Sequence, residues 1–495
     1  MVVNSISFLI FFTVVFLVYY LPFVRKRSGI QNSWLLLTSL FFYGFADWKM
    51  IPLLLGTTIV YYLIGIWLKN EIDKENTKRA SLITALGVVL GVGLLLYFKY
   101  LNFFAESFIN LFNAMGFHVS WSTLKIVLPV GVSFFTFKLI SYVIEIHREH
   151  IEPCRDFIAF GTFVAFFPTI LSGPIDRPGK FLPQLDSPRP FNYDLAVDGC
   201  RQILWGMFTK MCIADNLAIV TDSVWADSSL YYSSTLLWVV ILYPLQMYAD
   251  FDGYSNMAIG VGKLLGINVA RNFNHPFLAR NIAEYWRNWH ISLTGWLTDY
   301  VFSPLNIAFR NLGNWGMSLA IVITFVLIGM WHGANWTFSL FGLYHGLLYI
   351  PLIISGSFAK RKKLKPGKMG LPTLTDGLQM VLTFILVALG LILFKAPSVH
   401  SAYDFFCRLF DLSVFNIPAG FSELKAMDFR VYTLLFLAIM LVTEWTCRGK
   451  QYTLELTENA SFLGRKLNRW ALYVTLILLV LLCKGNEVQF IYFQF

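Results

Sequence analysis

The chain has 495 residues, of which 57% are hydrophobic and 14% are charged, and its formal net charge is +10 at pH 7. An ordinary soluble domain is about a quarter charged, so the composition excludes a soluble globular protein and predicts an integral membrane protein. The excess of positive charge predicts cytoplasmic loops near anionic lipid headgroups and gives no support to nucleic-acid binding.

Apolar stretches recur along the whole chain, and a helix needs roughly 20 such residues to cross a bilayer. We predict an all-α, polytopic protein with about ten to twelve transmembrane helices, together with re-entrant or interfacial helices. No repeat or linker divides the chain, so we expect a single membrane domain at 1–495, with a core at 127–346 and C-terminal transmembrane helices at 347–495. The clearest apolar stretches are 5–23, 51–68, 81–100, 236–248, 318–330, 380–394, 431–442 and 471–482.

The first apolar stretch precedes Arg25, Lys26 and Arg27, which is the reverse of a signal peptide. We therefore expect a retained helix whose following loop is cytoplasmic. Alternating spans then place the later basic stretches in the cytoplasm, as the positive-inside rule requires. These stretches are 69–79, 147–155, 360–368 and 448–469.

The middle of the chain mixes polar and helix-breaking residues into apolar sequence. Residues 166–178 contain three prolines and a glycine, and residues 248–255 contain Asp250 and Asp252. Irregular backbone at membrane depth is tolerated only where protein buries it or where it lines a wet cavity. We expect both segments to be re-entrant or kinked, and the two aspartates to form either a turn or helix cap or a cation site.

The first group of candidate site residues lies in 281–293. Asn281 and Glu284 have the spacing of a capping box, which predicts that a helix begins here. On a continuing helix, Trp286 and Arg287 would share one face with His290. This pattern fits an amphipathic helix at the membrane interface, but an ionisable group at membrane depth also favours a function for His290.

The second group, residues 331–336 (WHGANW), follows an apolar run directly, so His332 should lie inside or at the edge of a span. A continuing helix would place Asn335 and Trp336 beside His332, with Asn335 orienting the imidazole. Gly333 would let a substrate or another helix approach closely. The alternative is a core histidine satisfied by its neighbours.

Histidine titrates near neutral pH and suits proton transfer during acyl transfer. Two histidines could equally bind a metal or relay protons, but the scarcity of nearby carboxylates weakens the metal reading, and we predict no metal site. Relative to His332, the position of His345 predicts a structural role on another helix face. The six cysteines form no C-x-x-C pair, and nucleotide-binding loops, serine elbows and zincin motifs are absent from the sequence.

Taken together, residues 286–293 (WRNWHISL), 331–338 (WHGANWTF) and 344–346 (YHG) resemble the membrane-bound O-acyltransferase family, and most closely its bacterial alginate O-acetyltransferase branch. Supporting stretches are 128–137, 167–175, 254–260, 272–280 and 490–495. The chain departs from the family pattern at Asp252, where relatives usually carry a small hydroxyl residue. It also departs at 303–310, which lacks a glycine-rich turn.

The resemblance implies a helical fold around a transmembrane tunnel in a bacterial inner membrane. It implies His332 as the principal catalytic histidine, His290 as its partner, acetyl-CoA as a cytoplasmic donor rather than a bound cofactor, and an extracytoplasmic protein and polysaccharide as partners. The residues expected to support the two histidines or to bind substrate are Asn335, Trp331, Trp336, Arg287, Trp286, Asn288 and Glu284.

The hypothesis that follows is O-acetylation of an extracytoplasmic polysaccharide. His332 would act as general base or transient acyl relay, and His290 would orient the acceptor or stabilise charge. The alternatives are D-alanyl transfer to teichoic acid from a carrier protein and, from another class, a polytopic transporter. A transporter commonly shows two similar halves with matching broken helices, and this sequence does not.

Overall fold

The computed structural model describes residues 1, 3–119, 126–358, 371–456 and 466–485. Within these ranges the regular structure is entirely helical, which confirms the predicted fold class. The basic stretch 360–368 and the C-terminal residues 490–495 lie outside the described residues. The chain divides into two compact units, residues 1–200 with 258–270 and residues 201–257 with 271–495. The predicted single domain and its core at 127–346 stay predictions.

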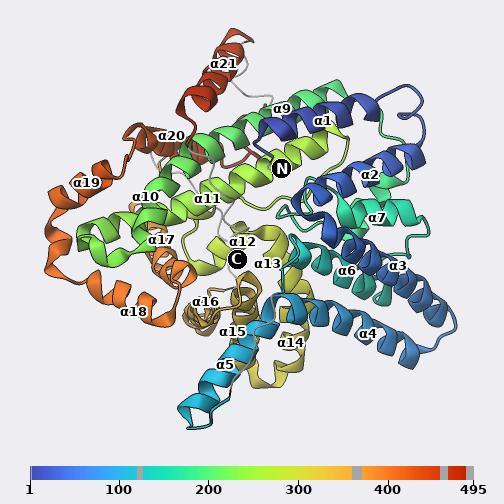
Figure 1. Ribbon diagram of the computed structural model, residues 1–495, viewed down its shortest axis with the longest axis horizontal. Helices are drawn as coiled ribbons and strands as arrows, with labels where there is room; N and C mark the ends of the chain where they lie inside the picture. The colour runs from blue at the N-terminus through green and yellow to red at the C-terminus, as the bar shows by residue number, and fades with distance from the viewer. Residues whose placement is uncertain (2, 120–125, 359–370, 457–465, 486–495) are drawn as a thin grey trace. The chain divides into compact units, whose positions relative to one another are not determined.

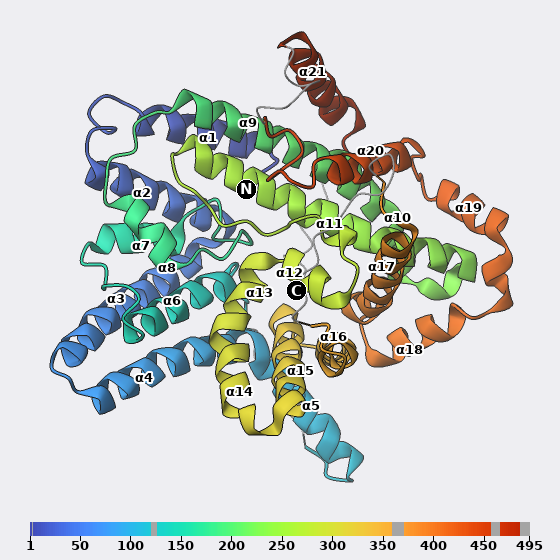
Figure 2. The ribbon, with the colours of Figure 1, turned by 180° about the vertical axis from the view of Figure 1, so that it is seen from behind.

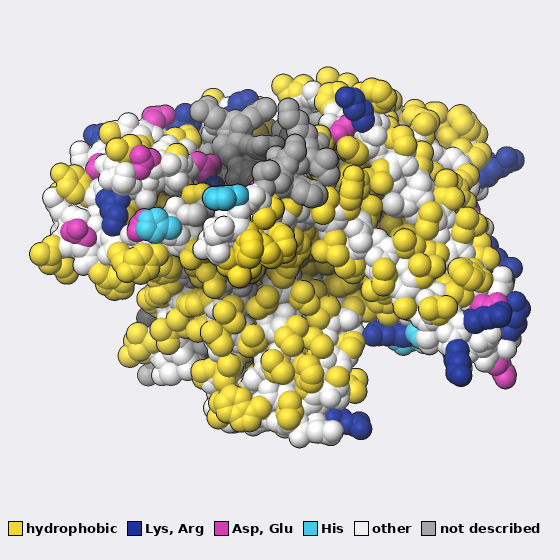
Figure 3. All heavy atoms as spheres, turned by 60° about the horizontal axis from the view of Figure 1, so that its bottom comes forward, with side chains coloured by type: hydrophobic (Ala, Val, Ile, Leu, Met, Phe, Trp, Pro, Cys, Tyr) yellow, Lys and Arg dark blue, Asp and Glu magenta, His cyan; other side chains and the backbone are white. Residues whose placement is uncertain are grey.

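Among the residues that the structure describes, seven helical stretches are long and apolar enough to cross a membrane, so this is a multi-pass membrane protein. One of them, Ser28–Asp73, contains both α2 and α3, so the number of spans stays a prediction. Two shorter apolar helices accompany them, Ile6–Tyr19 and Tyr432–Thr446. Hydrophobic side chains cover most of the face in Figure 3, as expected of a surface in contact with lipid.

In the first unit, α3, α4 and α6 pack against one another, and α2 packs against α7 (Figure 1). This unit also contains the first part of α9. Its helices are α1 (Ile6–Tyr19), α2 (Ser28–Asp47), α3 (Ile51–Asp73), α4 (Thr77–Leu95), α5 (Leu101–Ala114), α6 (Val132–His147), α7 (Phe157–Ala165), α8 (Pro178–Phe181) and α9 (Tyr193–Met207).

The predicted break at 166–178 is confirmed. Helix α7 ends at Ala165, and residues 166–177 are irregular and nearly all buried. Lys138 of α6 donates hydrogen bonds from Nζ to Phe163 O and Thr169 Oγ1, each at 3.1 Å. Gly131, at φ +74°, allows close approach of the break, because a Cβ there would lie 2.3 Å from Ile170 O. Burial within protein makes the irregular backbone tolerable at this point.

The second unit contains the remaining part of the polypeptide, including most of α11. Its α-helices are α10 (Asp215–Ala226), α11 (Ser233–Leu264), α12 (Ile282–Asn288), α13 (Ile291–Leu297), α14 (Ser303–Ala308), α15 (Gly313–His332), α16 (Trp336–Ile354), α17 (Leu374–Lys395), α18 (Val399–Arg408), α19 (Ile417–Ala426), α20 (Tyr432–Thr446) and α21 (Lys466–Cys483). A π-helical turn, η4 (Phe208–Ala214), connects α9 to α10.

The prediction of a break at 248–255 is wrong, because α11 runs through it without interruption. The buried charge of Asp250 is neutralised by Lys210 of η4, whose Nζ lies 2.7 Å from Asp250 and 2.6 Å from Asp215. Asp250 is therefore part of an ion-paired triad, neither a helix cap nor a turn. Pairing of this kind is what allows charged side chains to be buried.

Helices α15 and α16 form an antiparallel pair, which lies side by side in Figure 2. Glycines allow the two backbones to approach. A Cβ on Gly329 would lie 2.0 Å from Phe338 O, and one on Gly342 would lie 2.1 Å from Phe325 O. This close approach fixes the ends of both helices near His332.

We expect Gly329→Ala to lower the free energy of unfolding by about 1–3 kcal/mol, because the added methyl group would force the helices apart. Thermal unfolding of the purified protein in detergent measures the effect. Gly377→Ala on α17 is the matched control, since a Cβ there meets no described atom within 4 Å. Equal unfolding temperatures for the two variants would contradict the role of Gly329 in packing.

Candidate active site

Helix α12 begins where the capping pattern predicts. The Asn281 side chain accepts a hydrogen bond from Glu284 N at 2.9 Å, and the helix runs from Ile282 to Asn288. The carboxylate of Glu284 pairs with Arg280, with Nη2 and Oε1 2.8 Å apart. Glu284 therefore stabilises the start of the helix, and its role in supporting the histidines or binding substrate stays a prediction.

The prediction that Trp286 and Arg287 share a helix face with His290 is wrong. The helix ends at Asn288, Trp289 is extended, and His290 adopts the left-handed conformation at φ 46°. Arg287 donates from Nη2 to Phe358 O at 2.8 Å instead.

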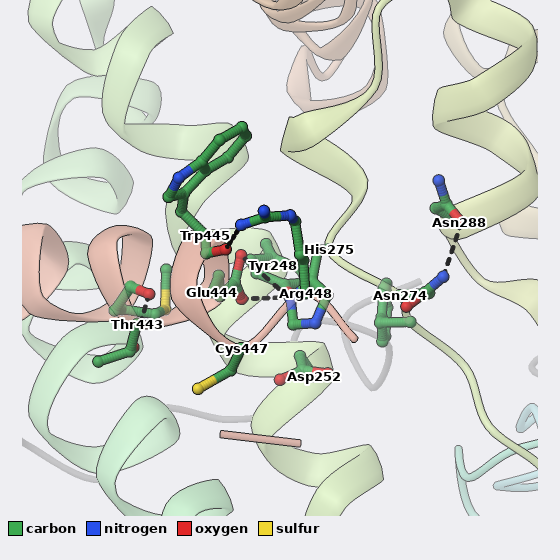
Figure 4. Close-up of polar contacts among 12 residues, drawn as sticks. Tyr248, Asp252, Asn274, His275, Asn288, Thr443, Glu444, Trp445, Cys447 and Arg448 are labelled. Atoms are coloured by element: carbon green, nitrogen blue, oxygen red, sulfur yellow. Dashed lines mark hydrogen bonds and ion pairs between the residues drawn. The ribbon is translucent and has the colours of Figure 1, made fainter. Parts of the chain in front are cut away.

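Residues 272–274, called the bracing segment here, provide the physical reason for this ending. Their backbone pairs with the backbone on both sides of His290. Asn274 N donates to Asn288 O at 3.0 Å, and Ile291 N donates to Asn272 O at 2.8 Å. The side chains of Asn274 and Asn288 also form a hydrogen bond at 3.3 Å (Figure 4).

His332 is the last residue of α15, as expected for a histidine at the edge of a span. The helix does not continue, because Gly333 is extended and Asn335 caps α16 by accepting from Thr337 N. Asn335 also donates to Pro397 O at 2.8 Å. The prediction that Asn335 and Trp336 lie beside His332 on one helix is therefore wrong, and Trp336 is 54% exposed.

Gly333 does permit a close approach, but the group that approaches belongs to the same chain. A Cβ on Gly333 would lie 2.1 Å from the ring of Phe338. That ring packs against Phe394 with centroids 5.1 Å apart, and Phe394 contacts the imidazole of His332 at 5.0 Å. Gly333 thus lets the aromatic packing close around His332.

The structure brings His290 and His332 into one aromatic cluster. The Trp331 ring lies near both, 5.9 Å from the His290 ring and 5.1 Å from the His332 ring, measured between centroids. The His290 ring also packs against that of Phe251 of α11, with centroids 4.7 Å apart and an angle of 84° between the ring planes. Both histidines are buried, with 0% and 5% exposed. Trp331 is therefore a neighbour of both histidines, while its supporting role and the catalytic roles of the histidines stay predictions.

His345 of α16 belongs to the same cluster, although the sequence indicated a structural role for it. Its ring lies 4.6 Å from Phe341, which in turn lies 6.3 Å from His332. Trp286 Nε1 donates to His345 Nδ1 at 3.3 Å, so Nδ1 carries no proton and a neutral ring has its proton on Nε2. The triplet 344–346 within the family-like pattern was the signal that pointed to this residue.

His290 belongs to none of the seven candidate spanning stretches, and burial lowers the pKa of its imidazole to about 3. The ring is therefore neutral at physiological pH. A neutral imidazole can donate one hydrogen bond and accept another, but it carries no charge of its own. This protonation state suits a group that polarises a carbonyl.

A second polar cluster lies in the same unit, around a small cavity of about 10 Å³. His275 Nδ1 lies 3.8 Å from Glu444 Oε2, and the Tyr248 hydroxyl donates to the other oxygen of Glu444 (Figure 4). Asp252 and Arg271 also line this cavity. Sequence reasoning gave His275 no role, because its partner Glu444 lies far along the chain. Among the described residues, no three His, Cys, Asp or Glu side chains are grouped as a metal site.

Comparison with known proteins gives consistent matches. Residues 148–365 match the model of the membrane-bound O-acyltransferase family. The chain is 34% identical over 422 residues to the probable alginate O-acetylase AlgI of Pseudomonas aeruginosa, covering 84% of this chain and 76% of that protein. It is 32% identical over 427 residues to the peptidoglycan O-acetyltransferase of Helicobacter pylori, covering 79% of this chain and 76% of that protein. It is 30% identical over 281 residues to the teichoic acid D-alanyltransferase of Bacillus subtilis, covering 55% of this chain and 69% of that protein.

Proposed function

Because the chain belongs to the membrane-bound O-acyltransferase family and is an acyltransferase, we propose that it transfers acetyl groups from acetyl-CoA to hydroxyls of an extracytoplasmic polysaccharide. The relatives matched over most of the chain are named for O-acetylation of alginate or peptidoglycan, which supports both the acetyl group and a saccharide acceptor. The proposed location is the bacterial inner membrane, where the donor is cytoplasmic. A separate extracytoplasmic protein completes delivery to the polysaccharide.

The observation that carries the proposed chemistry is that the rings of His290 and His332 both lie beside the ring of Trp331. In the proposed reaction, His332 accepts the proton of the acceptor hydroxyl, and the hydroxyl oxygen attacks the thioester carbonyl carbon. The carbon–sulfur bond then breaks, its electron pair stays on sulfur, and His332 returns the proton to the thiolate. Neutral His290 donates a hydrogen bond to the carbonyl oxygen as negative charge develops on it.

D-Alanyl transfer from a carrier protein is the second candidate, since the Bacillus subtilis relative is named for it. That relative matches 55% of this chain, whereas the alginate relative matches 84%. The difference favours acetyl transfer.

The test is transfer of labelled acetyl from acetyl-CoA in membranes containing the wild-type protein, with extracytoplasmic extract as acceptor. We expect label to appear in saccharide. If no label is transferred although acceptor and partner are present, while a phosphopantetheine carrier protein loaded with D-alanine does serve as donor, the D-alanyl reading replaces the acetyl one.

A further inference from the structure

The backbone of His290 adopts a conformation that is uncommon for residues other than glycine. Its φ of 46° and ψ of 51° lie in the left-handed region, where only about a few per cent of non-glycine residues are found, although histidine is there more often than most. Such a conformation persists only where the surroundings over-determine it. The question is which residue holds it.

The bracing segment pairs with the backbone on both sides of His290, and Asn272 supplies the central contacts. Its carbonyl oxygen accepts from Ile291 N at 2.8 Å, and its side-chain Oδ1 accepts from Ser292 Oγ at 2.6 Å. Asn272 is fully buried, with 0% exposed. Two hydrogen bonds therefore join Asn272 to the two residues that follow the histidine.

The other end of the Asn272 carboxamide is attached to α11. Nδ2 donates to Ser255 Oγ at 3.1 Å. Ser255 follows Phe251 by one helical turn, so the two side chains lie on one face of α11. Phe251 is the residue whose ring edge contacts the His290 imidazole at 4.7 Å. One face of α11 thus contacts the imidazole directly and holds its backbone through Asn272.

We propose that Asn272 is a positioning residue for His290, which fixes the direction of the imidazole toward Trp331 and His332 by joining α11 to the start of α13. Asn272 does not touch the reacting atoms in this arrangement. The inference rests on the proposed function only for its effect on catalysis, since the hydrogen bonds of Asn272 to Ile291, Ser292 and Ser255 are independent of the reaction.

The kinetic test uses Asn272→Ala, which removes the side-chain hydrogen bonds to Ser292 and Ser255 and keeps the carbonyl that accepts from Ile291 N, and the milder Ser292→Ala, which removes one of the two. We expect Asn272→Ala to lower kcat by about 100-fold, because displacement of a catalytic group by 1 Å can cost that much. KM for acetyl-CoA should not change. In a His290→Ala background, Asn272→Ala should cause no further loss, because a residue that acts through His290 has nothing left to position.

The matched control is Asn216→Ala. Asn216 is as buried as Asn272, with 1% exposed, and its Nδ2 donates to Met211 O, Cys212 O and Cys483 O. Its loss should lower the unfolding temperature and leave kcat intact. Losses that multiply in the Asn272/His290 double variant, or an equal loss of kcat in Asn216→Ala, would overturn the proposal.

A measurement that does not depend on activity separates the positioning of His290 by Asn272 from the proposed catalytic role of His290. Modification by diethyl pyrocarbonate, mapped by mass spectrometry, should spare His290 in the wild type and in Asn216→Ala but label it in Asn272→Ala and Ser292→Ala. Protection of His290 in all four proteins would refute positioning. If label appears as expected but His290→Ala retains full acetyl transfer, the positioning is upheld and the proposed role of His290 fails.

Discussion

Replacing His332 by alanine is expected to lower acetyl transfer by about 100- to 10,000-fold, the usual contribution of a general base. The variant should still fold, since α15 ends at this residue and the substitution shortens one side chain at the end of the helix. Initial rates with labelled acetyl-CoA, compared at equal amounts of folded protein, measure the effect. His400→Ala is the control, because the side chain of His400 is 85% exposed.

Full transfer by His332→Ala would show that another group accepts the proton. His345 would then be the first to test, because its ring lies in the same aromatic cluster, next to Phe341. Since Trp286 occupies Nδ1 of His345, only Nε2 of that ring could take part. The rate of acetyl transfer by a His332→Ala/His345→Ala double variant, measured as a function of pH, would distinguish a second base from direct attack by an already ionised acceptor.

The second large effect is expected for Lys210→Met. The substitution leaves Asp215 and Asp250 buried without their shared cation, and removing one partner of a buried ion pair costs about 3–5 kcal/mol. Thermal unfolding in detergent should show a marked drop in the midpoint. Lys180→Met, at an exposed lysine, should have little effect.

A rescue variant makes this prediction sharper. Adding Asp215→Asn and Asp250→Asn to Lys210→Met removes the uncompensated charges, so most of the lost stability should return. If the triple variant is as unstable as Lys210→Met alone, the loss is one of packing and the electrostatic account is wrong.

Local signals in the sequence were sufficient for much of the fold. The apolar stretches predicted the helical membrane class, the Asn281 and Glu284 spacing located the start of α12, and the prolines located the break at 166–178. Each of these signals acts within a few residues of the structure it determines. The position of His332 at the end of a span followed in the same way.

Other features depend on contacts between distant segments, and the sequence could not reveal them. Helix α12 stops before His290 because the bracing segment takes over the backbone pairing. The Asn335 side chain donates a hydrogen bond to Pro397 O, which comes much later in the chain. Asp250 lies within an intact α11 because Lys210 neutralises it from η4. Periodicity within one helix contains no information about such partners.

The rings around His290 and His332 also bear on how long an acyl group could wait between donor and acceptor. A thioester carbonyl held beside Trp331, Phe341 and Phe394 would meet aromatic carbon where bulk solvent would otherwise supply water. Hydrolysis would then compete poorly with transfer even when the acceptor is scarce. On this view aromatic packing sets how long a bound thioester survives, and the histidines set the speed with which its acyl group is transferred.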